Sequence, residues 1–173
     1  MNVRRRTVLL GSLVVPLLAA QSLSARAIAT NWTGELFLVR QAGIPESARF
    51  VESWYSRHAG TFVFDSDVSE LNERLITLWQ HHGATALAGF TTNAAFFCLS
   101  HIAADHGLRV LHRQIHVPGA PEPPSLVAAR VERVLDRFAD HRPLALFDAL
   151  PNSEHAFASW LLVPRAWLTR RLS

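Results

Sequence analysis

The sequence predicts a three-layer α/β domain with a mainly parallel sheet of the flavodoxin or Rossmann type. Short apolar runs alternate with segments that carry one apolar helical face, and a glycine closes each of the first three such segments, at Gly60, Gly83 and Gly107. Buried strands that alternate with helices are typical of parallel sheets with right-handed crossovers. A turn signal before the last apolar run adds the expectation of an antiparallel last strand.

The strands are expected where apolar and small residues form compact runs. These runs are 35–39, 61–64, 85–90, 109–112, 144–147 and 159–163. In a flavodoxin-like order the third strand is central, and we expect the first and fourth strands to flank it. The last two runs are predicted to pair antiparallel, because Pro151, Asn152 and Ser153 between them favour a turn.

Helices are expected between these runs, at 45–58, 67–82 and 94–106 and from Ser125 onwards. Pro45 suits a first helical position, and Asp67 with Glu70 forms a capping pair. The third helix is apolar nearly all round, so we expect it to be the most buried of the four.

Composition limits the chemistry of the chain. All 17 basic residues are arginine, and Cys98 is the single cysteine. The lack of lysine excludes a Walker phosphate loop and a Schiff base, and one cysteine excludes an internal disulfide and a Cys-rich zinc site. Four arginines lie in the first 27 residues, so acids slightly outnumber arginines in the rest of the chain. This balance does not indicate nucleic-acid binding.

Residues 1–27 have the order of a secretory signal, followed by a single domain over 28–173. Arg4 to Arg6 precede an apolar run from Val8 to Ala20, and Ala25-Arg26-Ala27 matches an Ala-x-Ala cleavage pattern. We expect cleavage near Ala27, a periplasmic or secreted location, and no stable membrane insertion afterwards. A signal for the general export pathway and an uncleaved anchor are the alternatives.

Three segments carry a family resemblance. The pair Arg5-Arg6 with the apolar residues after Thr7 is similar to the twin-arginine consensus. Together with Gly89-Phe90-Thr91-Thr92 and the stretch from Ser159 to Arg165, it resembles uncharacterised small twin-arginine-exported α/β proteins. The resemblance implies the twin-arginine machinery as a partner and brings no activity with it.

A ligand site is expected at the carboxyl ends of the strands, where open parallel sheets bind ligands. The candidate ligand-binding residues are Arg40, Asp65, Thr91, Thr92 and Asn93. Thr91 to Asn93 open a helix, whose free N–H groups can hold an anion, with Arg40 as a counter-charge. The alternative interpretation is an ordinary helix cap. A dinucleotide is not favoured, because no Gly-x-Gly-x-x-Gly occurs.

Two sets of possible metal ligands share a face: Cys98, His101 and Asp105 on a helix, and His112, Gln114 and His116 on a strand. For the first set a buried cysteine and a hydrogen-bonded histidine are the favoured interpretation, and for the second, edge or loop histidines. We therefore predict no metal site.

These observations favour a small-molecule-binding or accessory protein, which takes a small anionic ligand or serves an exported partner enzyme. The sequence identifies no catalytic residue, and it leaves open both the cofactor and the question of whether the protein is an enzyme. One alternative is a small periplasmic enzyme, of a hydrolytic or metal-assisted type, that uses the same crevice. Another is a structural or interaction domain, anchored by an exposed Trp160 or Trp167.

Overall fold

The computed structural model describes residues 34–55, 58–82, 85–117, 122–139 and 156–169. In chain order the elements are β1 (Leu36–Gln41), α1 (Pro45–Glu52), β2 (Gly60–Phe64), α2 (Val68–His82), β3 (Ala86–Thr92), α3 (Asn93–Asp105), β4 (Leu108–His116), α4 (Pro124–Ala139), β5 (Phe157–Pro164) and α5 (Arg165–Thr169). The signal sequence and the predicted strand at 144–147 lie outside the described residues. Within the described part, no helix is both long and apolar enough to cross a membrane.

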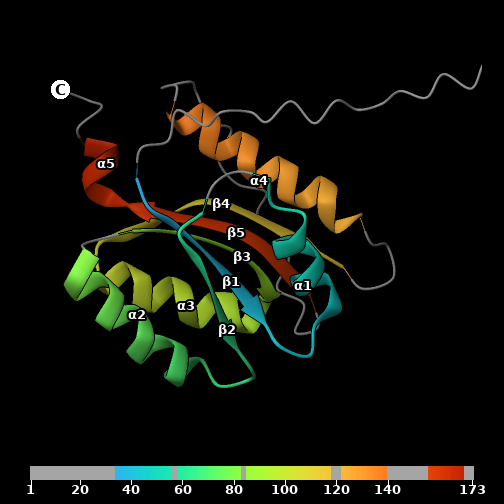
Figure 1. Ribbon diagram of the computed structural model, residues 1–173, viewed down its shortest axis with the longest axis horizontal. Coiled ribbons are helices and arrows are strands. Elements are labelled where there is room, and N and C mark those ends of the chain that lie inside the picture. The colour runs from blue at the N-terminus through green and yellow to red at the C-terminus, as the bar shows by residue number, and fades with distance from the viewer. Residues whose placement is uncertain (1–33, 56–57, 83–84, 118–121, 140–155, 170–173) are drawn as a thin grey trace, which may run out of the picture.

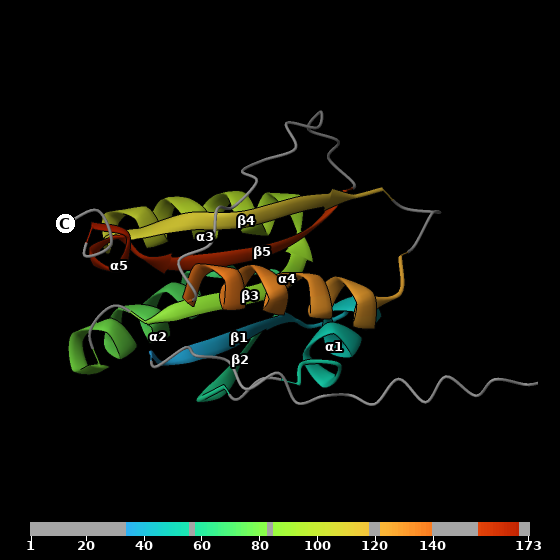
Figure 2. The same ribbon diagram turned by 90° about the horizontal axis from the view of Figure 1, so that it is seen from above.

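The described strands form one sheet in the order β2-β1-β3-β5-β4, which Figure 2 shows from above. β1 pairs in parallel with β2 and β3, whereas β5 is antiparallel to both β3 and β4. Four strands therefore run in one direction and the last strand runs against them. This arrangement confirms the predicted α/β class and the antiparallel last strand. The sheet is mixed rather than mainly parallel in its pairings, because two of the four described strand pairs are parallel and two are antiparallel.

The expected neighbours of the third strand were partly wrong. β3 lies beside β1 as expected, but β5 and not β4 occupies its other side. Seven of the eight residues of β5 are buried, from Ala158 to Pro164. A strand that is apolar on both faces needs a helix layer above and below it, which a central position provides.

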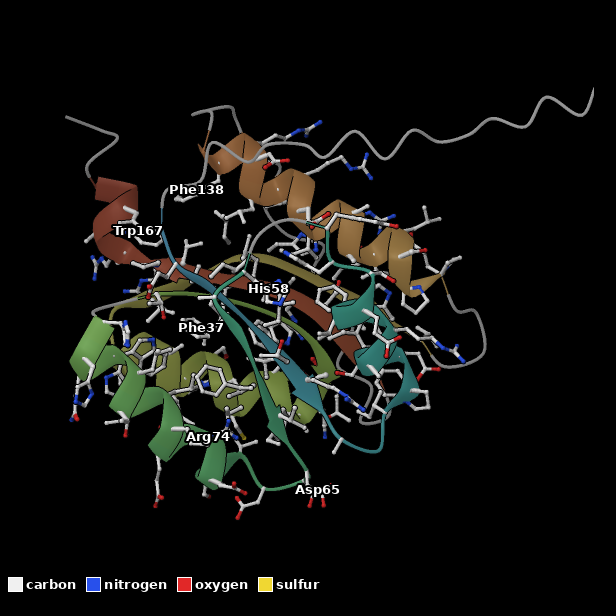
Figure 3. All side chains as sticks on the ribbon, in the orientation of Figure 1. Phe37, His58, Asp65, Arg74, Phe138 and Trp167 are labelled. Carbon is white, nitrogen blue, oxygen red and sulfur yellow. The ribbon has the colours of Figure 1, made fainter. Side chains whose placement is uncertain are left out.

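Helices cover both faces of the sheet, as Figure 1 shows: α1 and α4 lie on one side, and α2 and α3 on the other. Each face has its own core. On the side of α2 and α3 its members include Leu71, Leu75, Phe96, Leu99 and Trp160. On the side of α1 and α4 they include Leu36, Leu38, Phe50, Phe90, Leu135 and Leu161. Phe138 of α4 is a member of this second core, and Trp167 of α5 packs against the same core; Figure 3 labels both residues.

Two element boundaries differ from the sequence-based expectation. α1 ends at Glu52 rather than near His58, since Ser53 already has the conformation of a helix end. β4 continues to His116 and is twice as long as expected, because its second half alternates polar and apolar residues and so lacks a continuous apolar run.

The expectation that the third helix would be buried all round was wrong. α3 buries Ala95, Phe96, Leu99 and Ala103 against the sheet and leaves the opposite side in solvent. Phe97 on that side is 62% exposed. A single helix layer on the sheet covers one helix face only, whatever residues stand on the other.

Gly89 marks the closest approach between β3 and β5. A Cβ atom at this position would lie 2.6 Å from Cζ2 of Trp160 and 2.9 Å from the carbonyl oxygen of Val39. The absence of a side chain thus makes room for the indole, which is fully buried. Trp160 is consequently not an exposed anchor, and Trp167 is partly buried against the core.

Candidate functional site

Thr91, one of the predicted ligand-binding residues, has a fully buried side chain. Its hydroxyl accepts a hydrogen bond from the indole N–H of Trp160 at 3.0 Å and donates one to the carbonyl of Thr92 at 3.1 Å. The hydroxyl therefore already donates one hydrogen bond and accepts one within the domain. Thr91 therefore holds the core in place, and whether it meets a ligand stays a prediction.

Thr92 and Asn93 lie where the sequence predicts them, at the start of α3. The hydroxyl of Thr92 accepts from the backbone N–H of Ala95 at 3.2 Å, which confirms the predicted helix cap. The side-chain carbonyl of Gln41, at the end of β1, accepts from the backbone N–H of Thr92 at 2.9 Å. Asn93 accepts from the guanidinium of Arg113 on β4 at 2.9 Å. The two residues thus connect the ends of β1 and β3 with β4.

Arg40 and Asp65, the other two predicted site residues, lie in solvent at the ends of β1 and β2. Arg40 is in register with Val63 on one side and with Phe90 on the other. β1 separates Asp65 from β3, and Figure 3 shows the carboxylate of Asp65 pointing away from the molecule. The nearby Asp67 accepts from the backbone N–H of Ser69 at 2.7 Å, a bond that lowers the pKa of this carboxyl and confirms its role as a cap.

A polar cluster lies between β4 and α4, at positions where the rest of this sheet face is apolar. His112, Gln114 and His116 alternate along β4, opposite Leu161, Ser159 and Phe157 of β5. Leu161 and Phe157 belong to the core under α1 and α4, so the three β4 side chains face the same helices. We call this cluster the polar seam; it consists of His112, Gln114, His116, Glu122, Arg130 and Ser159.

Arg130 connects the helix side of the polar seam with its strand side. Its guanidinium forms a bidentate pair with the carboxylate of Glu122, in which one of the two bonds measures 2.8 Å. The same guanidinium also donates to the side-chain carbonyl of Gln114 on β4. Because Glu122 lies just before α4, these bonds tie the beginning of the helix to the edge of the sheet.

Both histidines of the polar seam favour the neutral form. Burial, together with the positive charge of Arg130 and the neighbouring His116, lowers the pKa of His112 from 6.5 to about 4. Burial also lowers the pKa of His116, while the carboxylate of Glu122 raises it and Arg130 lowers it. Near neutral pH the seam therefore holds one guanidinium, one carboxylate and two uncharged imidazoles.

His112 is the unsatisfied member of the polar seam. Its Nε2 atom is buried, and among the described residues it has no hydrogen-bond partner. Leaving a buried polar atom unpaired costs about 1–3 kcal/mol, so such atoms are uncommon in folded proteins. The other members named so far are bonded to one another, so the Nε2 atom of His112 is the one seam atom named so far whose hydrogen-bonding position is unused among the described residues.

Ser159 and His116 form a serine–histidine pair inside the seam. The serine hydroxyl and the Nε2 atom of His116 are 2.9 Å apart, a distance suited to a nucleophile and its base. Ser159, however, has no exposed surface. In this conformation the hydroxyl cannot reach a substrate, and the pair stabilises the contact between β4 and β5.

The remaining metal-ligand candidates do not converge. Cys98 and His101 are exposed on the outer side of α3, where His101 bonds to the carbonyl of Phe97 in its own helix at 2.8 Å. Within the described ranges, no group of three or more histidine, cysteine or acidic side chains is placed to hold a metal ion. The predicted buried state of Cys98 was wrong, since its side of α3 faces solvent.

Comparisons with known proteins find no match for this chain. No protein-family model, no curated protein and no solved structure is significantly similar to it.

Three of the six members of the polar seam were grouped from the sequence, and the other three were not predicted. The spacing of His112, Gln114 and His116 places them on one strand face, and this was visible. Arg130, Glu122 and Ser159 come from a helix, a loop and another strand, which only the tertiary fold brings together. One local signal existed: Ser159 is a polar residue within an otherwise apolar strand.

Proposed function

We propose that the domain binds a small anionic ligand at the carboxyl ends of its parallel strands, with the polar seam as the wall of the site. The observation that carries this proposal is the buried Nε2 atom of His112, which lacks a partner next to the guanidinium of Arg130. A carboxylate or a phosphate offers the negative charge that a guanidinium attracts, and its oxygens can accept a hydrogen bond from a neutral imidazole whose proton is on Nε2.

The strand order also favours a ligand site at the carboxyl ends of the parallel strands. The chain leaves β1 toward β2 and then returns across β1 to β3, so the direction of winding reverses between β1 and β3. Open α/β sheets bind ligands at such reversals, beyond the carboxyl ends of the strands. His116 lies level with this edge, because it is opposite Phe157, which in turn is opposite Thr92. Thr92 and Asn93, with Arg40 as a further cation, remain the proposed contacts on the side of β1 and β3.

An enzyme that uses the same place is the second candidate. The contact between the neutral His116 and the hydroxyl of Ser159 favours it. A nucleophilic role would require β5 or α4 to move, because Ser159 is fully buried as it stands.

The ligand proposal can be tested with inorganic phosphate and acetate as probes, by isothermal titration at pH 7. Arg130→Gln should weaken binding by about 10- to 150-fold, the value of one charge-assisted hydrogen bond. Arg133→Gln is the matched control, since Arg133 lies three residues further along α4, is exposed and bonds to its own helix. Equal affinities in the two variants, with unchanged melting temperatures, would contradict the proposal.

We further propose that the domain acts after export to the periplasm or beyond the cell, once the signal is cleaved near Ala27. The support is the arginine-rich, apolar and Ala-x-Ala order of residues 1–27. N-terminal sequencing of the protein from a periplasmic extract should begin near Ile28. Replacing Arg5-Arg6 by Lys-Lys should abolish export if the twin-arginine route is used, and export that persists would indicate the general pathway.

A further inference from the structure

The beginning of α4 is attached to the sheet by polar contacts rather than by an apolar core alone. Arg130 donates to Gln114 on β4 and pairs with Glu122, which precedes the helix by two residues. Beneath these bonds lie His112 and His116, both partly buried. The helix thus rests on a strand face that carries two titratable side chains next to a fixed cation.

The two histidines face one guanidinium and one carboxylate, so any proton that they take up leaves an excess of positive charge. From the side of α4 they meet the guanidinium of Arg130 and the carboxylate of Glu122, which that guanidinium already engages in two hydrogen bonds. From β5 they meet the neutral Ser159, and from β3 the ring of Phe90, whose centroid is 5.1 Å from that of His116.

The other charged residues of α4 and β4 point elsewhere. Glu132 accepts from the backbone N–H of Tyr55 at 2.7 Å and so faces α1, and Asp136 follows it by one turn on the same side of the helix. Arg133 and Arg137 are exposed. Arg113 lies on the opposite face of β4, where it bonds to Asn93 and covers the ring of Phe96.

We propose that this contact is an acid-sensitive latch. When His112 and His116 each take up a proton, three cations face the one carboxylate of Glu122 among the described residues, and the N-terminal half of α4 separates from β4. The opposite face of the sheet holds no comparable arrangement in the described chain, because α3 packs through Ala95, Phe96, Leu99 and Ala103. Acid therefore detaches the N-terminal half of α4 from β4 and leaves α3 packed on the sheet.

The direction of the pH dependence follows from linkage. The folded domain binds these two protons less readily than the unfolded chain, since burial lowers the pKa of both imidazoles. The attachment of α4 is therefore complete above pH 6.5 and is progressively lost as the pH falls toward 4.

Hydrogen exchange read by mass spectrometry tests the latch in the whole domain. Between pH 6.5 and 4.5, after correction for the intrinsic rates, amides in the first half of α4 should lose protection by at least about tenfold relative to those of α3. The double variant His112→Gln and His116→Gln should keep the ratio constant. His101→Gln is the matched control, because this histidine is exposed on a helix, and it should behave like the wild type.

Two results would overturn the proposal: α4 and α3 losing protection together, or α4 opening in the double variant as it does in the wild type. If the double variant fails to fold, His112→Phe replaces the ring by an apolar one of similar size. That variant should remove most of the pH dependence while keeping the packing under α4, and an unchanged pH profile would equally overturn the proposal.

Discussion

The two faces of the sheet are built on different principles. Under α2 and α3 the largest side chain, Trp160, fills the space that Gly89 leaves, and its only polar atom is bonded to Thr91. Under α1 and α4 the apolar core gives way at β4 to the polar seam, in which one buried atom has no partner among the described residues. Both faces contain a buried polar atom without a partner among the described residues, such as Nε1 of Trp79 under α2 and Nε2 of His112 under α4. The difference lies in the ionisable groups, because the second face gathers two histidines, an arginine and a glutamate in one cluster. We infer that the first face provides stability and the second provides the site.

The largest effect is expected from Gly89→Ala, on the face covered by α2 and α3. The added methyl group would meet both the indole of Trp160 and the backbone of Val39, and neither can move without disturbing two strands. We expect the free energy of unfolding to fall by about 3 kcal/mol in urea denaturation. Gly60→Ala on the edge strand is the control: its Cβ atom would lie 3.2 Å from the ring of Phe37, and it should cost clearly less. Similar losses in both variants would show that the approach at Gly89 is not special.

An intermediate effect is expected from acid, on the other face. Because burial and Arg130 lower the pKa of His112 to about 4, the fold should lose about 2–3 kcal/mol of stability as the pH falls from 6.5 to 4. Guanidinium denaturation curves at several pH values measure this loss in the wild type and in His112→Phe. The variant should lose much less over the same range. Parallel stability curves for the two proteins would contradict this account of the polar seam.

A smaller effect is expected from Ser159→Ala. This change removes the hydroxyl that contacts His116 at 2.9 Å and leaves a partly buried ring nitrogen unpaired, which should cost about 1 kcal/mol. Ser100→Ala removes a hydroxyl that only bonds to its own helix, and thermal melts of the two variants should rank in that order. If Ser159→Ala proved neutral, the pair would contribute nothing to the contact between β4 and β5.

The smallest effect is expected from Arg40→Gln, which should change stability by no more than about 0.5 kcal/mol because the side chain is exposed. Any loss of affinity for phosphate in this variant, measured by titration, would then report on binding alone. Thr91→Val would not serve this purpose, since it also removes the hydrogen-bond partner of the Trp160 indole. A melting temperature shifted by several degrees in Arg40→Gln would show that Arg40 supports the fold.

Local pattern was sufficient for much of the fold. Compact apolar runs and glycines at the ends of helical segments correctly predicted β1, β2, β3 and α2. Thr92 correctly predicted the start of α3. The position of β5 between β3 and β4 could not be predicted from local sequence patterns. A strand that is apolar on both faces must be central. Which strands it separates depends on pairings between residues about 40 to 75 positions apart, such as His116 with Phe157 and Leu87 with Leu162.

The candidate site was less accessible from the sequence, for a related reason. The alternation of His112, Gln114 and His116 predicted a shared face but not what lies opposite. Arg130 belonged to an arginine-rich helix side that suggested a solvent-exposed surface. Its role appears only once α4 is laid over β4, where its guanidinium meets Gln114 and Glu122.

The central place of β5 also has a consequence for the order in which the domain can be completed. β5 is made last, yet it is the strand that joins β3 to β4. Until residues 157–164 have left the ribosome, the growing chain can form only the three-stranded part β2-β1-β3, with β4 held by α3 alone. Insertion of the last strand between two strands already made is a long-range step, and such steps are slow and expose open sheet edges meanwhile. Nascent chains arrested before Phe157 should therefore depend on chaperones, and synthesis beyond Pro164 should allow the five described strands to pair.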